Sequence, residues 1–262
     1  GSAWLQELLA TGQAPIVAAR SSALQRMNLP NQQLRTLDLS VNQGFDSATD
    51  GVGTIVHCAG LAHNRGKASD YKTINTLATV NLATAALNNG VRHFIFVSTL
   101  NVVPASVDDP CASTRQWVLP VGPYSRSKAL AEQALEDIFR DTECHLTILR
   151  PALVYDKAST ANLLSLATIV NKIPVLLPPL GHRLMISRPD LVRLLVNLIH
   201  QPPLPLKGGQ ENTRVIVAAD GQRYSARRIG RALSIVPRNR WGFARVPLPA
   251  SIWRLLAGLR DK

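Results

Sequence analysis

The chain has 262 residues and a formal net charge of +12, and 46% of its residues are hydrophobic. This composition is typical of a folded domain with a large core, and it excludes a disordered, collagen-like or disulfide-rich protein. The excess of basic side chains favours an anionic partner, such as a nucleotide, a phosphosugar, nucleic acid or an anionic membrane, although a solvated basic surface explains the charge about as well.

The cysteines and histidines do not form a recognisable metal or disulfide pattern. Three widely spaced cysteines, Cys58, Cys111 and Cys144, favour a reducing compartment. The histidines are scattered without zinc-site spacing, so we expect no metal. The most apolar stretch, 163–180, is interrupted by polar residues and prolines and is too broken to span a membrane. Since no signal peptide is recognisable, we expect a cytoplasmic protein.

Short apolar segments alternate with helical patterns over the first two thirds of the chain. Residues 4–10 have a helical pattern that stops at Gly12, and longer helices are expected over 71–89 and 124–139. Strands are expected at 16–19, 34–39, 54–58, 93–97 and 146–149. Buried strands separated by helices of this length predict an α/β fold, a Rossmann-like doubly wound parallel sheet with helices on both faces.

The pattern loosens after Pro151, which predicts a smaller C-terminal lobe. The elements expected there are helices at 160–170 and 190–199, a strand at 215–217 and a helix capped by Ser225. We therefore divide the chain into a larger domain over 1–158 and a lobe over 159–262 that is partly interwoven with the sheet.

Four predicted strands are followed by residues suited to ligand binding. They are Arg20, Asp38, Gly60 and Thr99. In parallel sheets, ligands bind beyond the carboxyl ends of the strands, so we expect a binding site at that edge.

The stretch Tyr124-Ser-Arg-Ser-Lys128 opens the helix that follows the strand ending in Ser98-Thr99. Residues four apart on a helix share a face, and the charge of Lys128 favours the phenolate form of Tyr124, whose free pKa is about 10. A hydroxyl, a phenol and an ammonium in this order can take a proton from an alcohol while a nicotinamide accepts the hydride. The alternatives are a half-buried tyrosine beside a solvated lysine, and a strand-end threonine bonded to backbone.

Together these residues resemble the extended short-chain dehydrogenases/reductases of the nucleotide-sugar epimerase/dehydratase family, closest to bacterial enzymes of polysaccharide biosynthesis that act on UDP-sugars. Three motifs resemble the family's cofactor-binding turns: Gly1-Ser-Ala-Trp-Leu5 the end of its glycine turn, Asp38-Leu39 its adenine-contacting pair, and Val56-His-Cys-Ala59-Gly60 the turn beneath the cofactor. Asn75 begins a stretch that resembles the family's central helix. Phe94–Thr99 resembles the strand that carries the catalytic hydroxyl, and Leu149–Tyr155 resembles the strand that closes over the nicotinamide.

The resemblance implies roles for individual residues. It makes Thr99, Tyr124 and Lys128 catalytic. It assigns NAD(P) binding to Gly1, Arg20, Asp38, Leu39, Ala59, Gly60, Asn75, Tyr124, Lys128 and Pro151. It also assigns contacts with the phosphates of a nucleotide-sugar substrate to Asn162 and Arg183, for which a helix cap and a solvated arginine are the alternatives.

Two departures from the family's sequence pattern reduce the number of candidate reactions and cofactors. Dehydratases of the family have Thr-Asp-Glu where this chain has Thr99-Leu100-Asn101, which disfavours elimination of water and leaves a 4-epimerase or a 4-ketoreductase. Arg20 stands where NAD-preferring members often have an acid. An arginine followed by Ser21 and Ser22 suits a 2′-phosphate, so the prediction leans toward NADP; a surface arginine for Arg20 and a capping role for Asp38 are the alternatives.

The start of the chain departs from the expected dinucleotide fold, which opens with a strand and a glycine-rich turn. Gly1 is either the last glycine of such a turn or part of an added Gly-Ser pair. We therefore expect the first strand and most of the glycine loop to be missing, and the chain to bind NAD(P) weakly.

Other classes of function stay open at this stage. They are a reductase of another carbonyl substrate, a non-catalytic dinucleotide-binding protein on the same fold and, suggested only by charge, a nucleic-acid-binding protein. No recognition motif for nucleic acid is present, so we expect none as a partner. By resemblance, a homodimer that pairs through the Tyr124–Lys128 helix is a further expectation.

Overall fold

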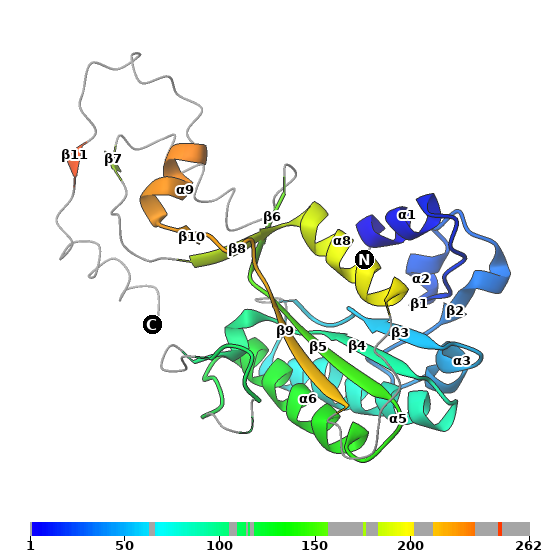
Figure 1. Cartoon of the computed structure of the whole chain (residues 1–262). Helices are drawn as coiled ribbons and strands as arrows, with labels where there is room; N and C mark the ends of the chain where they lie inside the picture. The colour runs from blue at the N-terminus through cyan, green and yellow to red at the C-terminus, as the bar shows by residue number, and fades with distance from the viewer. Residues whose placement is uncertain are drawn as a thin grey trace. The chain divides into compact units, whose positions relative to one another are not determined.

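The computed structural model describes residues 2–62, 66–104, 109–113, 115, 118–156, 175–176, 183–201, 212–233 and 246–247 (Figure 1). The chain divides into two compact units. The first contains Gly1–Ala152 and Asp190–Ala218, and the second contains Leu153–Pro189 and Ala219–Lys262. The chain therefore leaves the first unit after residue 152 and returns to it for residues 190–218.

A four-stranded parallel sheet forms the centre of the first unit. Its strands are β3 (Thr54–His57), β4 (His93–Val97), β5 (His145–Pro151) and β9 (Thr213–Ala218), in the order β3-β4-β5-β9. Two further strands, β1 (Val17–Ala19) and β2 (Leu34–Thr36), form a separate parallel pair. The parallel pairing and the intervening helices confirm the predicted Rossmann-like α/β fold.

Helices cover both faces of this sheet. α5 (Ala78–Asn88) and α6 (Pro123–Phe139) lie on one side, and α1 (Ser2–Ala10) and α8 (Arg188–His200) lie on the other (Figure 1). The remaining helical segments of the first unit are α2 (Ser21–Leu24), α3 (Phe45–Thr49), α4 (Ala68–Tyr71), a π-helix over Lys72–Leu77, and 3₁₀ turns over Asn31–Gln33 and Leu100–Val102.

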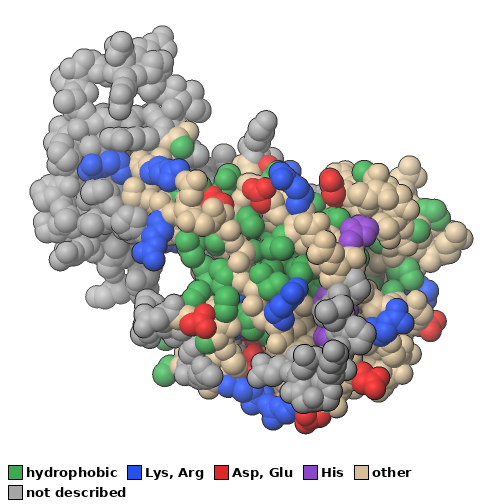
Figure 2. Space-filling model, in the orientation of Figure 1, with side chains coloured by type: hydrophobic (Ala, Val, Ile, Leu, Met, Phe, Trp, Pro, Cys, Tyr) green, Lys and Arg blue, Asp and Glu red, His purple; other side chains and the backbone are tan. Residues whose placement is uncertain are grey.

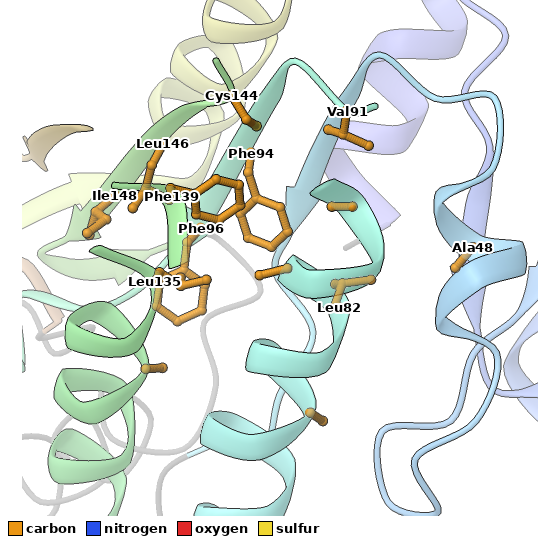
Figure 3. Packing of buried hydrophobic residues seen from close by; sticks show 14 of the residues in the cluster. Ala48, Leu82, Val91, Phe94, Phe96, Leu135, Phe139, Cys144, Leu146 and Ile148 are labelled. Carbon is orange, nitrogen blue, oxygen red and sulfur yellow. The ribbon is translucent and has the colours of Figure 1, made fainter. Parts of the chain in front are cut away.

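The main core lies between the sheet and the helix pair α5 and α6. Alternate residues of a strand point to the same face, and Phe94 and Phe96 of β4 and Ile148 of β5 are all fully buried there. The ring of Phe139 at the end of α6 packs on Phe94 with centroids 5.3 Å apart (Figure 3). This packing fixes α6 against the sheet, and with it the helical turn that carries Tyr124.

The second unit contains a small three-stranded sheet in the order β10-β8-β6. Its strands are β6 (Leu153–Tyr155), β8 (Arg183–Ser187) and β10 (Arg223–Tyr224). The predicted cap of the next helix is confirmed, because Ser225 Oγ accepts a bond from the Arg228 amide in α9 (Ala226–Leu233). A further strand pair, β7 (Val175–Leu176) with β11 (Val246–Pro247), belongs to the same unit.

Two predicted elements differ in form from the prediction. The strand expected over 34–39 ends at Thr36, because Asp38 Oδ1 accepts bonds from both the amide and the hydroxyl of Ser40 and closes a turn. The single helix expected over 71–89 contains the π-helical segment Lys72–Leu77. The helix predicted over 160–170 lies outside the described residues.

Basic side chains are spread over the visible surface (Figure 2). A group of them lies over β10 and α9, and the others stand apart, several with an acidic side chain beside them. Arg115, Arg140, Arg188 and Arg193 each form an ion pair. Among the described residues, no helix is long and apolar enough to cross a membrane.

Candidate active site

Lys128 lies at the carboxyl end of β4, at the edge of the sheet where the sequence predicts a site. Gly122 precedes α6 and Pro123 occupies its first turn, a position that proline suits because its missing N–H needs no partner there. Lys128 Nζ donates to the Val97 carbonyl oxygen at 3.1 Å and lies 4.5 Å from the centroid of the Phe96 ring. The side chain is only 5% exposed, so its ammonium is held among the residues that end β4.

Burial lowers the pKa of Lys128 to about 8. Cys58, just beyond β3, and Glu132, one helical turn along α6, oppose this shift. Burial also lowers the pKa of His57 to about 3, and the charge of Lys128 acts in the same direction. A pKa of about 8 leaves Lys128 mostly protonated at neutral pH, and nearby groups can change its charge.

Asn75 joins the turn after β3 to the start of α6. It is 1% exposed and lies in the π-helical segment. Its Oδ1 accepts from the Leu61 amide at 2.7 Å, and its Nδ2 donates to the Leu61 carbonyl and to Ser127 Oγ, both at 3.1 Å. Ser127 Oγ in turn donates to the Tyr124 carbonyl at 2.8 Å. One amide side chain thus positions both the Gly60 turn and the backbone that carries Tyr124.

The Gly60 backbone approaches these groups closely. A Cβ at this position would lie 2.8 Å from Asn75 Oδ1 and 3.7 Å from Lys128 Nζ. The first distance is shorter than side-chain carbons tolerate. Glycine is therefore required for the turn to sit against both Asn75 and Lys128.

The phenol of Tyr124 is partly buried beside a second tyrosine. The rings of Tyr124 and Tyr71 meet edge to face with centroids 6.1 Å apart, and Tyr71 Oη donates to the Ala62 carbonyl at 3.0 Å. Burial raises the pKa of Tyr124, and Tyr71 adds to the shift. The protein surroundings alone therefore favour the protonated phenol, in contrast to the phenolate expected from the motif.

Thr99 follows β4 directly and caps the 3₁₀ turn Leu100–Val102. Its Oγ1 accepts a bond from the Asn101 amide at 3.2 Å. A hydroxyl that accepts one bond still has its own proton to donate, so this cap is compatible with a contact to a ligand oxygen.

Arg20 and Asp38 follow two paired strands, β1 and β2, and lie near each other. Arg20 is exposed, and its charge contributes to the lowered pKa of Asp38, which comes mainly from the bonds with Ser40. Leu39 is buried in the main core cluster. This edge therefore presents one exposed guanidinium beside one carboxylate.

The other residues selected from the sequence are placed as follows. Ala59 is exposed in the turn before Gly60, and Pro151 is buried at the end of β5. Arg183 is exposed at the start of β8, in the second unit. Gly1 and Asn162 lie outside the described residues, and the described part of the chain contains no cluster of metal-ligating side chains.

Sequence reasoning missed Tyr71 and Ser127 as parts of this arrangement. Ser127 lies inside the Tyr124–Lys128 motif, and its position on the buried face of α6 was a usable signal. Tyr71 gave no such signal, because its contact with Tyr124 joins two helices that are far apart in the sequence.

Comparison with known sequences decides the family. The profile of the NAD dependent epimerase/dehydratase family matches residues 1–170 of the chain. The chain belongs to this family. The match includes every segment that surrounds Lys128 and Asn75, so the candidate site lies in the part of the chain that defines family membership.

Individual relatives agree with this assignment. The chain is 29% identical over 238 residues to a UDP-glucose 4-epimerase of Vibrio cholerae, covering 86% of this chain and 69% of the relative. It is 30% identical over 134 residues to an N-acetyl-alpha-D-glucosaminyl-diphospho-ditrans,octacis-undecaprenol 4-epimerase of Escherichia coli O157:H7, covering 49% of this chain and 39% of the relative. The chain thus spans less than half the length of the second relative.

A solved structure shows the same fold. The protein MoeE5, in complex with UDP-glucose and NAD, superimposes with a TM-score of 0.66 at 21% identity, covering 87% of this chain and 75% of that one.

Proposed function

We propose that this protein is an NAD(P)-dependent enzyme that acts at C4 of a nucleotide sugar, as a 4-epimerase or a 4-ketoreductase. The observation that carries the proposal is the position of Lys128, bonded to the Val97 carbonyl at the end of β4, one turn from Tyr124 and beside the Asn75–Gly60 contact. The names of both sequence relatives end in 4-epimerase, which favours epimerisation over a single reduction.

The residues beyond the strands fit a dinucleotide. The missing side chain at Gly60 lets the turn after β3 pack against Asn75 and Lys128, and Lys128 supplies a buried donor beside that turn. Arg20 is an exposed guanidinium at the end of β1, where it suits a 2′-phosphate and supports a preference for NADP. When bound here, a nicotinamide cofactor would supply the hydride-transfer chemistry and, in its oxidised form, a positive charge.

Tyr124 handles the proton of the reacting hydroxyl. Burial and Tyr71 raise its pKa, so the phenolate forms only where positive charge lies nearby. Lys128 contributes that charge when protonated, which its pKa of about 8 permits at neutral pH. Tyr124 then takes the proton from the sugar O4 and returns it when the C4 ketone is reduced.

Thr99 orients the reacting oxygen, and its neighbours limit the chemistry. The Thr99 hydroxyl donates to O4 while its own oxygen is fixed by the Asn101 amide. Leu100 and Asn101 follow where an acid and a base would be needed to eliminate water from the sugar. These residues support oxidation and reduction at C4 without dehydration.

The proposed substrate class is supported by Arg183 and by the relatives. Arg183 has the planar guanidinium that suits a diphosphate, and Asn162 is proposed as a second contact to the same group. UDP is the proposed carrier, on the strength of the Vibrio cholerae relative that covers most of the chain.

Replacing Tyr124 by Phe tests the proposed chemistry. The variant removes one oxygen, so we expect turnover of the sugar to fall at least about 1000-fold, while nucleotide binding changes little. Turnover is read by NMR of the sugars after incubation with UDP-hexoses and their 4-keto forms, and binding by calorimetry. Ser125→Ala is the matched control on the same turn. Unchanged turnover in Tyr124→Phe would sink the assigned role, and inactivity of the wild-type protein on the whole panel would reject the substrate class.

A further inference from the structure

We propose that Arg150 and Glu132 form a buried positioning pair, which fixes the segment 109–113 onto α6 and thereby holds the reacting side chains in register. The inference rests on the proposed function for its kinetic consequences but not for its structural ones. Neither residue contacts the reacting atoms in this scheme; both act through the chain that they hold.

The guanidinium of Arg150 joins three parts of the first unit. Nη2 donates to Glu132 Oε2 at 2.7 Å, and Nε lies 3.3 Å from both Glu132 carboxylate oxygens. Nη1 donates to the backbone carbonyl oxygens of Pro110 and Ala112, at 2.6 and 2.8 Å. Both side chains of the ion pair are 0% exposed. One cation therefore ties β5, α6 and the segment 109–113 together.

The repeats of the strand and of the helix explain how the side chains of Arg150 and Glu132 come into contact. Strand alternation puts Arg150 on the same face of β5 as Ile148, toward α6. Tyr124, Lys128 and Glu132 follow one another at four-residue intervals along one side of α6. The stripe that carries the candidate acid–base groups thus continues directly into the residue that binds Arg150.

A second set of contacts fastens the same segment one turn further along α6. Ser113 Oγ donates to Glu136 Oε2 at 2.7 Å, and the guanidinium of Arg115 pairs with Glu136 at 3.3 Å and with Asp137. The segment 109–113 and Arg115 are therefore held along α6 at two successive turns of the helix. On the other side, the Ser98 amide donates to the Leu149 carbonyl at 2.7 Å, so Thr99 and Arg150 both follow residues that are paired in the sheet.

The stability that the ion pair adds does not by itself explain why Arg150 and Glu132 are buried as charged residues. Burying two charges costs much of what their attraction returns, and a well-packed apolar pair of similar size is often as stable. An apolar pair cannot, however, bind the carbonyl oxygens of Pro110 and Ala112. The planar fork of Arg150 meets two carbonyl groups and one carboxylate at once, and this is a geometric function rather than a packing one.

The pair also acts on Lys128. Glu132 raises the pKa of Lys128 against the effect of burial. The other titratable groups that interact with this ammonium are Cys58 and His57, both at the end of β3. A change at Glu132 therefore alters the charge of Lys128 as well as the position of the segment 109–113.

Three variants separate positioning from stability. Arg150→Lys keeps the charge but loses the fork, Glu132→Gln keeps the shape but loses the charge, and the double variant Glu132→Gln/Arg150→Met removes both buried charges. Leu135→Ala is the control, because Leu135 is fully buried on the same helix and contacts the core rather than the segment. Thermal unfolding of all four variants gives the stability scale on which the other measurements are compared.

The structural readouts do not require turnover. In Arg150→Lys and in the double variant, we expect faster amide hydrogen exchange in peptides that cover residues 109–115, with little change in β4. In Glu132→Gln we expect the Lys128 pKa, followed by NMR of the lysine side chains, to fall below its wild-type value. Leu135→Ala should lower the melting temperature without either local effect. If exchange in the 109–115 peptides stays at the wild-type rate in Arg150→Lys, the proposal is wrong.

Measurement of kcat and KM provides a second test of the positioning role. We expect kcat to fall about 10- to 100-fold in Arg150→Lys and in the double variant, with KM nearly unchanged, even where the double variant melts at the wild-type temperature. Full kcat in a double variant of wild-type stability would overturn the positioning role. A wild-type protein with no turnover would instead reject the proposed function, and the exchange and titration results would still decide the inference.

Discussion

At the scale of single residues, burial acts on Tyr124 and Lys128 in opposite directions. It raises the pKa of the phenol and lowers that of the ammonium to about 8, so both shifts favour a neutral group. For Tyr124 to act as the proposed base, its phenolate needs positive charge nearby, which protonated Lys128 and an oxidised nicotinamide would both supply. Under the proposed function, a bound oxidised cofactor would therefore add to the activation of Tyr124.

Arg20 is the residue that we expect to distinguish the two forms of the cofactor. Replacing it by Ala removes a charged partner for a 2′-phosphate, so affinity for NADP should fall about 10- to 100-fold while affinity for NAD changes less than about 3-fold. Calorimetric titration of both cofactors measures the difference. Arg26→Ala is the control, since Arg26 is also exposed and lies six residues further along the chain. An equal loss for both cofactors in Arg20→Ala would contradict the assignment.

The sequence predicts some of the site's residues better than others, and the difference follows from contact distance along the chain. Tyr124 and Lys128 lie on one helical turn, so their common face could be predicted from spacing alone. The Arg150–Glu132 pair joins a strand to a helix, and only the register between them brings the two together. The pairing of Asn75 with Leu61 and Ser127 was hidden for a similar reason, although Asn75 itself was selected by resemblance.

At the scale of elements, the π-helical segment Lys72–Leu77 is the main departure from the predicted helices. A π-helix adds a residue to a helical turn and is frequent at functional sites. Here the segment contains Asn75, whose side chain reaches Leu61 and Ser127. Hydrophobic periodicity over 71–89 predicted a helix, but it carries no information about a single widened turn.

Replacing Asn75 by Ala should loosen the connection between the β3 turn and α6. The change removes three hydrogen bonds of a buried side chain, so we expect the free energy of unfolding to fall by about 2–4 kcal/mol. Urea denaturation at neutral pH measures the loss. Asn81→Ala serves as control, because Asn81 is on α5 and its side chain bonds only near the surface, to Asn42; its cost should stay below about 1 kcal/mol. Similar losses in both variants would argue against Asn75 as the connecting residue.

At the scale of the whole molecule, two buried histidines link stability to pH. Burial lowers the pKa of His57 to about 3 and that of His93 to about 4. His57 stacks on Phe96 with centroids 5.7 Å apart, and its Nε2 lies 2.9 Å from Thr79 Oγ1; His93 Nε2 lies 2.9 Å from Thr147 Oγ1. Both rings are thus built into the sheet as neutral groups, mainly because of their burial.

The sign of the effect follows from proton binding. Between the folded and unfolded pKa values of these histidines, from about 3 or 4 up to about 6.5, the unfolded chain binds more protons, so the free energy of unfolding rises with pH. Each ring contributes up to about 1.4 kcal/mol per pH unit in that window.

Replacing His57 by Gln should therefore remove about 3 kcal/mol of the stability difference between pH 4 and pH 7. The variant is also less stable than the wild type at both pH values, because the stack on Phe96 is lost. Urea denaturation at the two pH values measures this difference. His200→Gln, at the exposed end of α8, should leave it unchanged, and a His57→Gln variant with the full wild-type difference would show that other groups set the acid sensitivity of the fold.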